Sequence, residues 1–382
     1  MTASVAVCAP RPGLAVHSVQ TVVVEGTPVT LGLVEATEPR FSSADPGSRN
    51  MVLLRVRAFS CNYRDRALIL HLARRCAHDD GPESVAHIGS EFVADVLATG
   101  EDVTRCQPGD RVIADVSYPY SGTHGVAPGV ATNHASQRFR LLHEAKVRVV
   151  PPTMPDAAAA AFGLGAQTAY AILRRLQPAP DSTVLVTAAR SATALFTATA
   201  LRNRTSARVV GLTSSTGHER ALRAHGFHDV VTLPRGRDRD GTRFLLDTLG
   251  PVDVVIDPFF DLYLDRTLPM LRPGGQYLTC GLENQSAIVP GDGDVRLTEV
   301  LLLAIARNLQ LIGNCLGSPE DLTDALEDHA AGRVPVVIDS VHRAETVGDF
   351  LLRTYSSQNR FGKAVFVYES PGVVGDRTWP QT

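Results

Sequence analysis

The stretch that decides the fold is 184-VLVTAARSATALFTATALRNRTSARVVGLTSS-215. Two apolar, β-branched runs enclose a helical run, and this pattern predicts a strand, a tight turn, a helix and a second strand. Strand candidates at 229–232, 252–256, 276–281 and 309–313 alternate with further helix candidates. Such alternation predicts a parallel sheet with helices on both faces, so residues 151–316 are expected to form a Rossmann-type doubly wound domain.

The first 150 residues have a different pattern. Short β-branched runs at 21–24, 29–34, 52–56, 92–97 and 111–116 are separated by Gly, Pro and Asp turns. They predict an antiparallel barrel or sandwich, with long irregular segments at 70–90 and 117–135. Because strand patterns return at 335–341 and 362–368, residues 1–150 and 317–382 are expected to form one β-rich domain, with the parallel-sheet domain inserted between them.

The composition excludes several classes of protein. A formal net charge of -3 over 382 residues argues against a nucleic-acid partner. No apolar run is long enough to span a membrane and no secretory signal is visible, so a cytoplasmic protein without a membrane partner is expected. The six cysteines are scattered and form no CxxC pair, which argues against a disulfide framework or a four-cysteine zinc site.

Five separated segments occur in an order that resembles the medium-chain dehydrogenase/reductase superfamily, especially its zinc-free quinone-reductase and enoyl-reductase members. They are NYRD at 62–65, IGSEFVADVLATGEDVTRCQPGDRVIA at 88–114, AAAAAFGLGAQTAYAIL at 157–173, LRPGGQYLTCGL at 271–282 and NRFGKAVFVY at 359–368. The resemblance implies an α/β fold with a GroES-like β-rich catalytic domain and a Rossmann-type nucleotide domain. It also implies an NADP(H)-dependent oxidoreductase acting on a small molecule.

The expected metal content follows from one triplet. Zinc-using members of the superfamily carry a histidine ligand within Gly-His-Glu, whereas this chain has Ser90 between Gly89 and Glu91. A serine hydroxyl is a poor zinc ligand beside imidazole or thiolate. Cys61 lies near the place of the first ligand but lacks a partner, so no catalytic zinc is expected.

The turn at 188–193 contains no glycine, although dinucleotide-binding turns usually do. Ser191 and Thr193 can instead donate hydroxyl hydrogen bonds to phosphate beside a helix N-terminus. Arg190 either pairs with the phosphates or occupies their place. The second strand ends at Ser214 and Ser215 without the acidic residue that binds the ribose of NAD, which favours NADPH; N-capping is the alternative role for these serines. The predicted cofactor-binding residues are Thr168, Arg190, Ser191, Thr193, Ser214, Ser215, Arg220, Gly281, Asn359 and Lys363, of which Thr168, Gly281, Asn359 and Lys363 rest on the resemblance.

Without zinc, reduction of an activated C=C bond demands less of the protein than oxidation of an alcohol. Tyr63 is the expected proton donor or oxyanion partner, or else an aromatic ring that seals the barrel edge. Asn62 is expected to bond the substrate carbonyl or the ribose. The predicted reaction is NADPH-dependent reduction of an enoyl- or alkenal-type compound of specialised metabolism.

Two alternatives stay open. One is a carbonyl reductase or alcohol dehydrogenase. The other is a redox-silent protein that catalyses a step such as cyclisation, with Phe259 filling the cleft. The apolar helix and strand at 298–316 predict a homodimer, because the corresponding strands of the superfamily pair across a two-fold axis.

Overall fold

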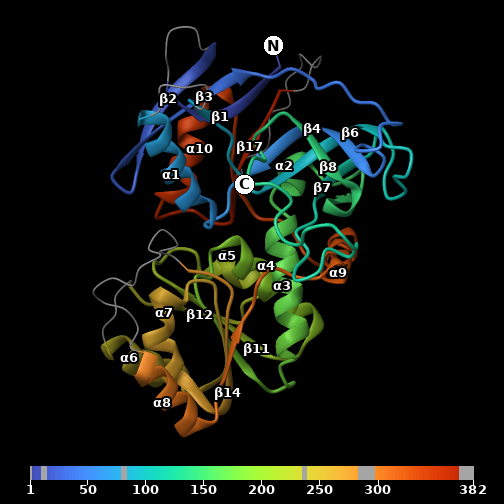
Figure 1. Ribbon diagram of the computed structural model, residues 1–382. Coiled ribbons are helices and arrows are strands. Elements are labelled where there is room, and N and C mark those ends of the chain that lie inside the picture. The colour runs from blue at the N-terminus through green and yellow to red at the C-terminus, as the bar shows by residue number, and fades with distance from the viewer. Residues whose placement is uncertain (1, 10–14, 79–83, 235–238, 283–296, 370–382) are drawn as a thin grey trace.

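The computed structural model describes residues 2–9, 15–78, 84–234, 239–282 and 297–369 and shows a β-rich lobe above an α/β lobe (Figure 1). The α/β fold class expected from the sequence is confirmed. Among the described helices, none is long and apolar enough to cross a bilayer.

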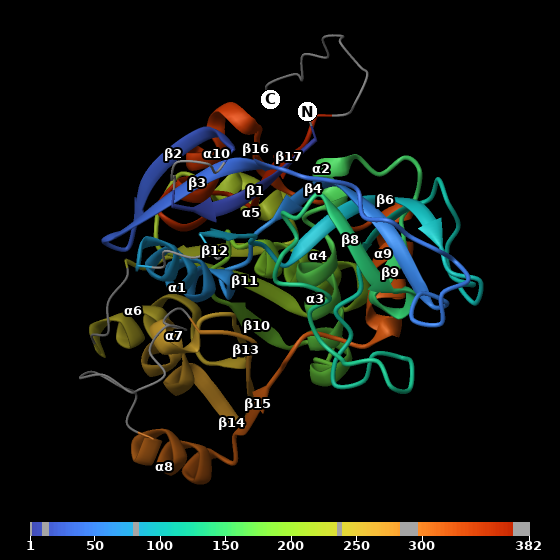
Figure 2. The same cartoon turned by 45° about the horizontal axis from the view of Figure 1, so that its top comes forward.

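The α/β lobe is built on a six-stranded parallel sheet in the order β12-β11-β10-β13-β14-β15, which can be followed in Figure 2. From β10 the chain adds β11 and β12 on one side and then β13, β14 and β15 on the other, so the strand order reverses between β10 and β13. The carboxyl ends of these two strands flank this topological switch point, where ligands of such sheets bind. The strands are β10 (Thr183–Val186), β11 (Arg208–Thr213), β12 (Asp229–Thr232), β13 (Val252–Asp257), β14 (Leu271–Thr279) and β15 (Gln310–Gly313). The helices are α3 (Gly163–Leu176), α4 (Ala192–Arg204), α5 (Glu219–Ala224), α6 (Arg239–Leu249), α7 (Phe260–Thr267) and α8 (Leu297–Arg307).

The β-rich lobe contains a four-stranded sheet, β2-β3-β1-β5, and a seven-stranded sheet, β16-β17-β4-β6-β7-β9 with β8 paired to β4. The C-terminal strand β17 pairs with β4, so the chain returns to its first lobe, as the tail pattern predicts. The strands are β1 (Ala3–Cys8), β2 (Val16–Val24), β3 (Thr27–Glu35), β4 (Met51–Ser60), β5 (Val85–Ala86), β6 (Glu91–Thr99), β7 (Arg111–Ala114), β8 (Phe139–His143), β9 (Val147–Val149), β16 (Ile338–His342) and β17 (Lys363–Val367). The helices of and around this lobe are α1 (Asp65–His78), α2 (Asp156–Ala159), α9 (Pro319–Ala330) and α10 (Val347–Tyr355).

One sequence interpretation is wrong. The segment 70–90 was expected to be irregular, but helix α1 extends to His78. Ile69, Leu72, Ala73 and Cys76 are buried at helical spacing against the β-rich core, which explains why this stretch is helical. The other long segment, 117–135, contains neither helix nor strand, as expected.

Candidate functional site

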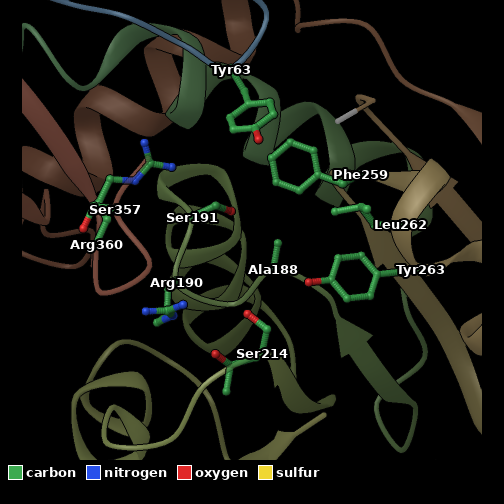
Figure 3. Close-up of a pocket in the computed structure, with 11 residues that line it drawn as sticks. Tyr63, Ala188, Arg190, Ser191, Ser214, Phe259, Leu262, Tyr263, Ser357 and Arg360 are labelled. Atoms are coloured by element: carbon green, nitrogen blue, oxygen red, sulfur yellow. The ribbon is translucent and has the colours of Figure 1, made fainter. Parts of the chain in front are cut away.

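Two adjoining hollows lie between the lobes in the described part of the chain. The larger has a volume of about 450 Å³ and the smaller, drawn in Figure 3, about 90 Å³. Tyr63, Ser191, Phe259 and Arg360 line both, so the hollows form one groove. The groove runs past the carboxyl ends of the central strands of the parallel sheet, where its topology predicts a ligand.

The glycine-free turn forms one wall of this groove. Ala188 adopts a left-handed conformation with φ +48°, the conformation that a glycine usually supplies. The Ser191 N–H donates to the Ala188 carbonyl at 2.8 Å, and the Ser191 hydroxyl accepts from the Ala194 N–H at 3.3 Å, so this serine caps α4. Ser191 and Thr193 both line the larger hollow, so the N-terminus of a 13-residue helix opens onto the groove.

Two buried hydroxyl groups near the groove have no hydrogen-bond partner among the described residues: Thr168 Oγ1 and Ser215 Oγ. Thr168 lies on α3 and lines the larger hollow, whereas Ser215 follows β11. A buried hydroxyl without a partner is unfavourable by about 1–3 kcal/mol. Thr168 is therefore positioned to bond a polar ligand, whereas Ser215 lines neither hollow.

The end of β11 contributes Thr213 and Ser214 to the smaller hollow. Arg190 lies on the same side as Ser214 (Figure 3), and its Nη1 donates to the Gln358 carbonyl at 2.7 Å. Arg220 is exposed on α5 and does not line either hollow. The structure thus brings Arg190, and not Arg220, to the hydroxyl-rich end of the strand.

Tyr63 contacts the nucleotide lobe directly. Its ring meets the ring of Phe259 edge-on, with the centroids 4.8 Å apart (Figure 3). The Tyr63 hydroxyl accepts from Arg66 Nη1 at 2.8 Å, and the Arg66 guanidinium carbon lies 4.3 Å from the Tyr63 ring centroid. Phe259 thus lines the groove and is not a residue of the deep core.

Asn62 lies next to Tyr63, but both ends of its amide are already bonded. Nδ2 donates to Ser90 Oγ at 3.0 Å and to Glu91 Oε1 at 2.5 Å. Lys363 Nζ donates to Asn62 Oδ1 at 2.5 Å and to Glu91 Oε1 at 2.7 Å. The Tyr355 hydroxyl donates to the Asn62 carbonyl at 3.0 Å. In this arrangement Asn62 holds the loop of Tyr63, and its amide does not point a free group at a substrate.

The Lys363–Glu91 ion pair is buried, with side-chain exposures of 8% and 2%. Glu91 Oε2 also accepts from the Leu164 N–H at 3.2 Å. The pair therefore joins β17, β6 and the first turn of α3 at the floor of the larger hollow. The pairing is unlike the cofactor contact that the resemblance implies for Lys363, although Lys363 does line that hollow.

The polar groups near Cys61 form hydrogen bonds with one another. The Ser90 hydroxyl donates to Asp65 Oδ2 at 2.5 Å, and the Asn62 N–H donates to the same oxygen at 2.8 Å. Burial raises the pKa values of the Cys61 thiol and the Asp65 carboxyl. The described residues contain no group of three or more His, Cys, Asp and Glu side chains arranged to bind a metal ion.

Of the remaining predicted residues, one lines the groove and one does not. Gly281 lines the larger hollow, and a Cβ there would lie 2.6 Å from the Pro258 carbonyl oxygen, so only glycine fits. Asn359 is exposed and does not line the groove. Its neighbour Arg360, which was not predicted, lines both hollows and donates to the Thr354 carbonyl. Burial lowers the pKa of the Arg360 guanidinium. Arg360 lies within the matching segment NRFGK, but the resemblance implied cofactor contacts only for Asn359 and Lys363.

A buried carboxyl group supports the floor of the groove. Asp257, at the end of β13, accepts from Thr187 Oγ1 at 2.5 Å, from the Phe259 N–H at 3.0 Å and from the Tyr277 hydroxyl. Burial raises the pKa of Asp257 to about 6. These bonds fix the start of α7 and hence the position of Phe259.

The comparisons with known proteins agree with this architecture. Residues 48–175 match the model of the alcohol dehydrogenase GroES-like domain. The chain is 27% identical over 339 residues to acryloyl-coenzyme A reductase of Metallosphaera sedula, covering 85% of this chain and 93% of that protein. It is 28% identical over 276 residues to quinone oxidoreductase-like protein 2 of Bos taurus, covering 69% and 71%.

Among solved structures, the 2-octenoyl-CoA carboxylase reductase CinF in complex with NADP and 2-octenoyl-CoA superposes with a TM-score of 0.70 at 20% identity, covering 90% of this chain and 83% of that one. A GroES-like lobe, a Rossmann-type sheet and a groove at the switch point between them form the same two-lobed architecture. The sequence matches and the fold both support a relationship to the medium-chain dehydrogenase/reductase superfamily.

Proposed function

We propose that the protein is an NADPH-dependent reductase that transfers hydride to an activated C=C bond of a small enoyl- or alkenal-type compound. The observation that carries the proposal is the lining of the groove. The N-terminus of α4, Arg190 and Arg360 all line the groove, and none of the described lining residues is Asp or Glu. Such a lining favours a polyanionic ligand, since helix N-termini and guanidinium groups both bind phosphate. A relative that is an acryloyl-coenzyme A reductase, and a similar fold that holds NADP and an enoyl-CoA, support the same reading.

NADPH is favoured over NADH by the end of β11. Ser214 and Arg190 line the smaller hollow there, and the described residues of that lining include no acidic residue that would bond the ribose diol of NADH. Ser215 supplies a second hydroxyl with no described partner. Hydroxyl groups beside a guanidinium suit a 2′-phosphate.

The residues present fit this cofactor. The unpartnered Thr168 hydroxyl and the close backbone passage at Gly281 lie on the larger hollow, where a nicotinamide would enter. Ser191, Thr193 and the α4 N-terminus would hold the diphosphate, with Arg360 beside it. When bound, NADPH supplies the hydride.

The proposed catalytic residue is Tyr63, which would protonate the product or bond its enolate oxygen. Arg66 donates to the Tyr63 oxygen and so stabilises the phenolate that proton transfer leaves behind. Asn62 is a positioning residue in this scheme, because its bonds to Glu91 and Lys363 fix the loop that carries Tyr63. We also propose that the reaction needs no zinc, since Lys363 places an ammonium group beside Glu91 close to Cys61.

A homodimer is part of the proposal. Strand β15 is the edge strand of the described sheet, and Leu311 on it is 44% exposed. On the preceding helix α8, Leu302 and Ile305 are 66% and 76% exposed. An apolar helix beside an open sheet edge suits pairing with a second copy, which a solution mass measurement tests.

One observation favours the redox-silent alternative. Phe259 lines both hollows and meets Tyr63 across the cleft, and the smaller hollow measures only about 90 Å³. If these rings close the groove to NADPH, the cleft would serve a non-redox step.

The experiment that tests the proposal follows the loss of NADPH absorbance with α,β-unsaturated thioesters and ketones, and in parallel with saturated aldehydes. We expect turnover of the conjugated compounds, with Tyr63→Phe slower in kcat by about 100-fold or more. Tyr120→Phe, at an exposed tyrosine outside the groove, is the matched control and should keep full activity. Turnover of saturated aldehydes alone would establish the carbonyl-reductase alternative, and no turnover with any of them would contradict the proposal.

A further inference from the structure

The larger hollow carries positive charge at two places. Arg360 and Lys363 come from the segment before and at the start of β17, whereas Arg64 interacts with Cys315 and with Asn133 of the long loop. Lys363 is 8% exposed and pairs with Glu91 at 2.7 Å, and Arg360 lines both hollows beside the proposed cofactor. Arg64 also pairs with a carboxylate, Asp65 at 2.9 Å, but its side chain is 37% exposed and it lines the larger hollow alone, so the proposed cofactor does not explain it.

The Arg64 side chain is held in a fixed position with one edge spare. Its Nη1 donates to Asp65 Oδ1 at 2.9 Å and to Asn133 Oδ1 at 2.9 Å. Asp65 is 1% exposed and is itself fixed by Ser90, whereas the Arg64 side chain is 37% exposed. Within the described residues, Nη2 and Nε of Arg64 donate no hydrogen bond. A guanidinium anchored through one nitrogen offers the other two as a planar pair of donors, which matches a carboxylate or a phosphate.

The walls between Arg64 and the cofactor end are mainly apolar. Pro128, Val130 and Leu316 come from the long loop and from the segment after β15, and Phe259 closes the opposite side. The loop is fixed to that segment by the Tyr118 N–H, which donates to the Gly317 carbonyl at 2.8 Å. This arrangement suits a ligand with an apolar unsaturated part and an anionic group at its outer end.

We propose that Arg64 is a specificity-determining residue that binds an anionic group of the substrate, so that the substrate is an unsaturated acyl compound carrying a carboxylate or a phosphate. This inference rests on the proposed function for the identity of the reacting bond. It adds the class of substrate, because a guanidinium beside apolar walls suits a compound that carries an anionic group. The carboxylate of an oxo-acid and the phosphate of a pantetheine-bearing thioester share the same chemistry toward a guanidinium.

The test compares charged and neutral members of two substrate pairs. The first pair is trans-4-oxo-2-pentenoate and 3-penten-2-one; the second is crotonyl-CoA and S-crotonyl-N-acetylcysteamine. For Arg64→Gln we expect kcat/KM to fall by about 10- to 100-fold for the charged member of the preferred pair and to stay within about twofold for its neutral partner. The pair that shows the split identifies the source of the anion. Arg74→Gln changes an exposed arginine on helix α1, which follows Arg64 and does not bring Arg74 into the groove, and should change neither member.

A binding measurement separates this inference from the proposed function. Calorimetric titration with the unreactive analogues levulinate and butyryl-CoA measures the anion site without any redox step. If the protein turns over no substrate, yet Arg64→Gln weakens binding of one analogue and Arg74→Gln does not, the anion site stands and the reductase proposal fails. If Arg64→Gln lowers kcat/KM equally for charged and neutral substrates, or leaves analogue binding unchanged, the inference is wrong.

Discussion

The two ends of the groove differ in how their polar groups are satisfied. Around Asn62, Glu91 and Lys363, both ends of the Asn62 amide and the ammonium are bonded within the protein. At the nucleotide end, Thr168 and Ser215 keep buried hydroxyls without a described partner, and the α4 N-terminus faces the groove. A satisfied cluster supports a site, whereas spare polar groups mark where a ligand is expected to bind.

The largest effect is expected from Lys363→Ala. Removing the ammonium leaves Glu91 charged and buried, which should lower the free energy of unfolding by about 3–5 kcal/mol. Urea unfolding followed by circular dichroism measures the loss. Pairing Lys363→Met with Glu91→Gln should recover part of it, because no unpaired charge is left behind. A loss below about 1 kcal/mol would show that the cluster is solvated like a surface pair.

The second prediction concerns Asp257 and pH. Because burial raises the pKa of Asp257 to about 6, the folded protein holds a proton that the unfolded chain releases near its ordinary, lower value. This contribution to stability is therefore complete below about pH 4 and is lost as the pH rises through about 6. Asp257→Asn removes the titration, so the variant should gain stability relative to the parent protein between those values.

Urea unfolding at a series of pH values measures that difference. Carboxyl groups with lowered pKa values, such as Asp328 beside Arg204 and Arg333, are common to both proteins and cancel in the comparison. A constant difference across the range would show that Asp257 stays ionised in the fold.

Arg190→Gln tests the nucleotide end of the groove. Loss of the guanidinium beside Ser214 should weaken NADPH binding by about 10- to 100-fold and change NADH binding by less than about threefold. Fluorescence titration measures both constants. Arg220→Gln is the matched control, since Arg220 is exposed on α5 and does not line the groove. If Arg220→Gln alone weakens NADPH binding, the assignment drawn from the sequence is right and the one drawn from the structure is wrong.

The smallest effect is expected from Thr168→Val. The Thr168 hydroxyl has no described partner, so its removal should leave stability unchanged or slightly raised while NADPH affinity falls by about two- to tenfold. Thr354→Val provides the contrast, because that hydroxyl donates to the Phe350 carbonyl at 2.7 Å and its loss should lower stability. Equal stability losses in both variants would show that Thr168 has a structural partner.

Much of the fold could be predicted from the sequence. Every strand of the parallel sheet and both C-terminal strands lie within a few residues of the expected positions, because their β-branched runs and turn residues are local signals. Helix α1 was missed, since its buried side chains alternate with arginines and histidines that resemble a surface loop. The short strands β8 and β9 carry too few residues to show a period.

The site was harder to predict because its geometry depends on contacts between distant segments. Ser191 and Thr168 could be chosen from local motifs, and both line the larger hollow. The bonding of Asn62 to Lys363 joins residues 301 positions apart, and no local pattern contains it. For the same reason, the sequence could not show that Arg190, and not Arg220, lies at the end of β11. That depends on where α5 packs in the folded protein.

The most direct test of the central claim is a fluorescence titration of the parent protein with NADPH, with NADH in parallel. We expect saturable binding of NADPH in the micromolar range and markedly weaker binding of NADH. No saturation at millimolar NADPH would contradict it, and would mean that Phe259 and Tyr63 close the groove to the cofactor.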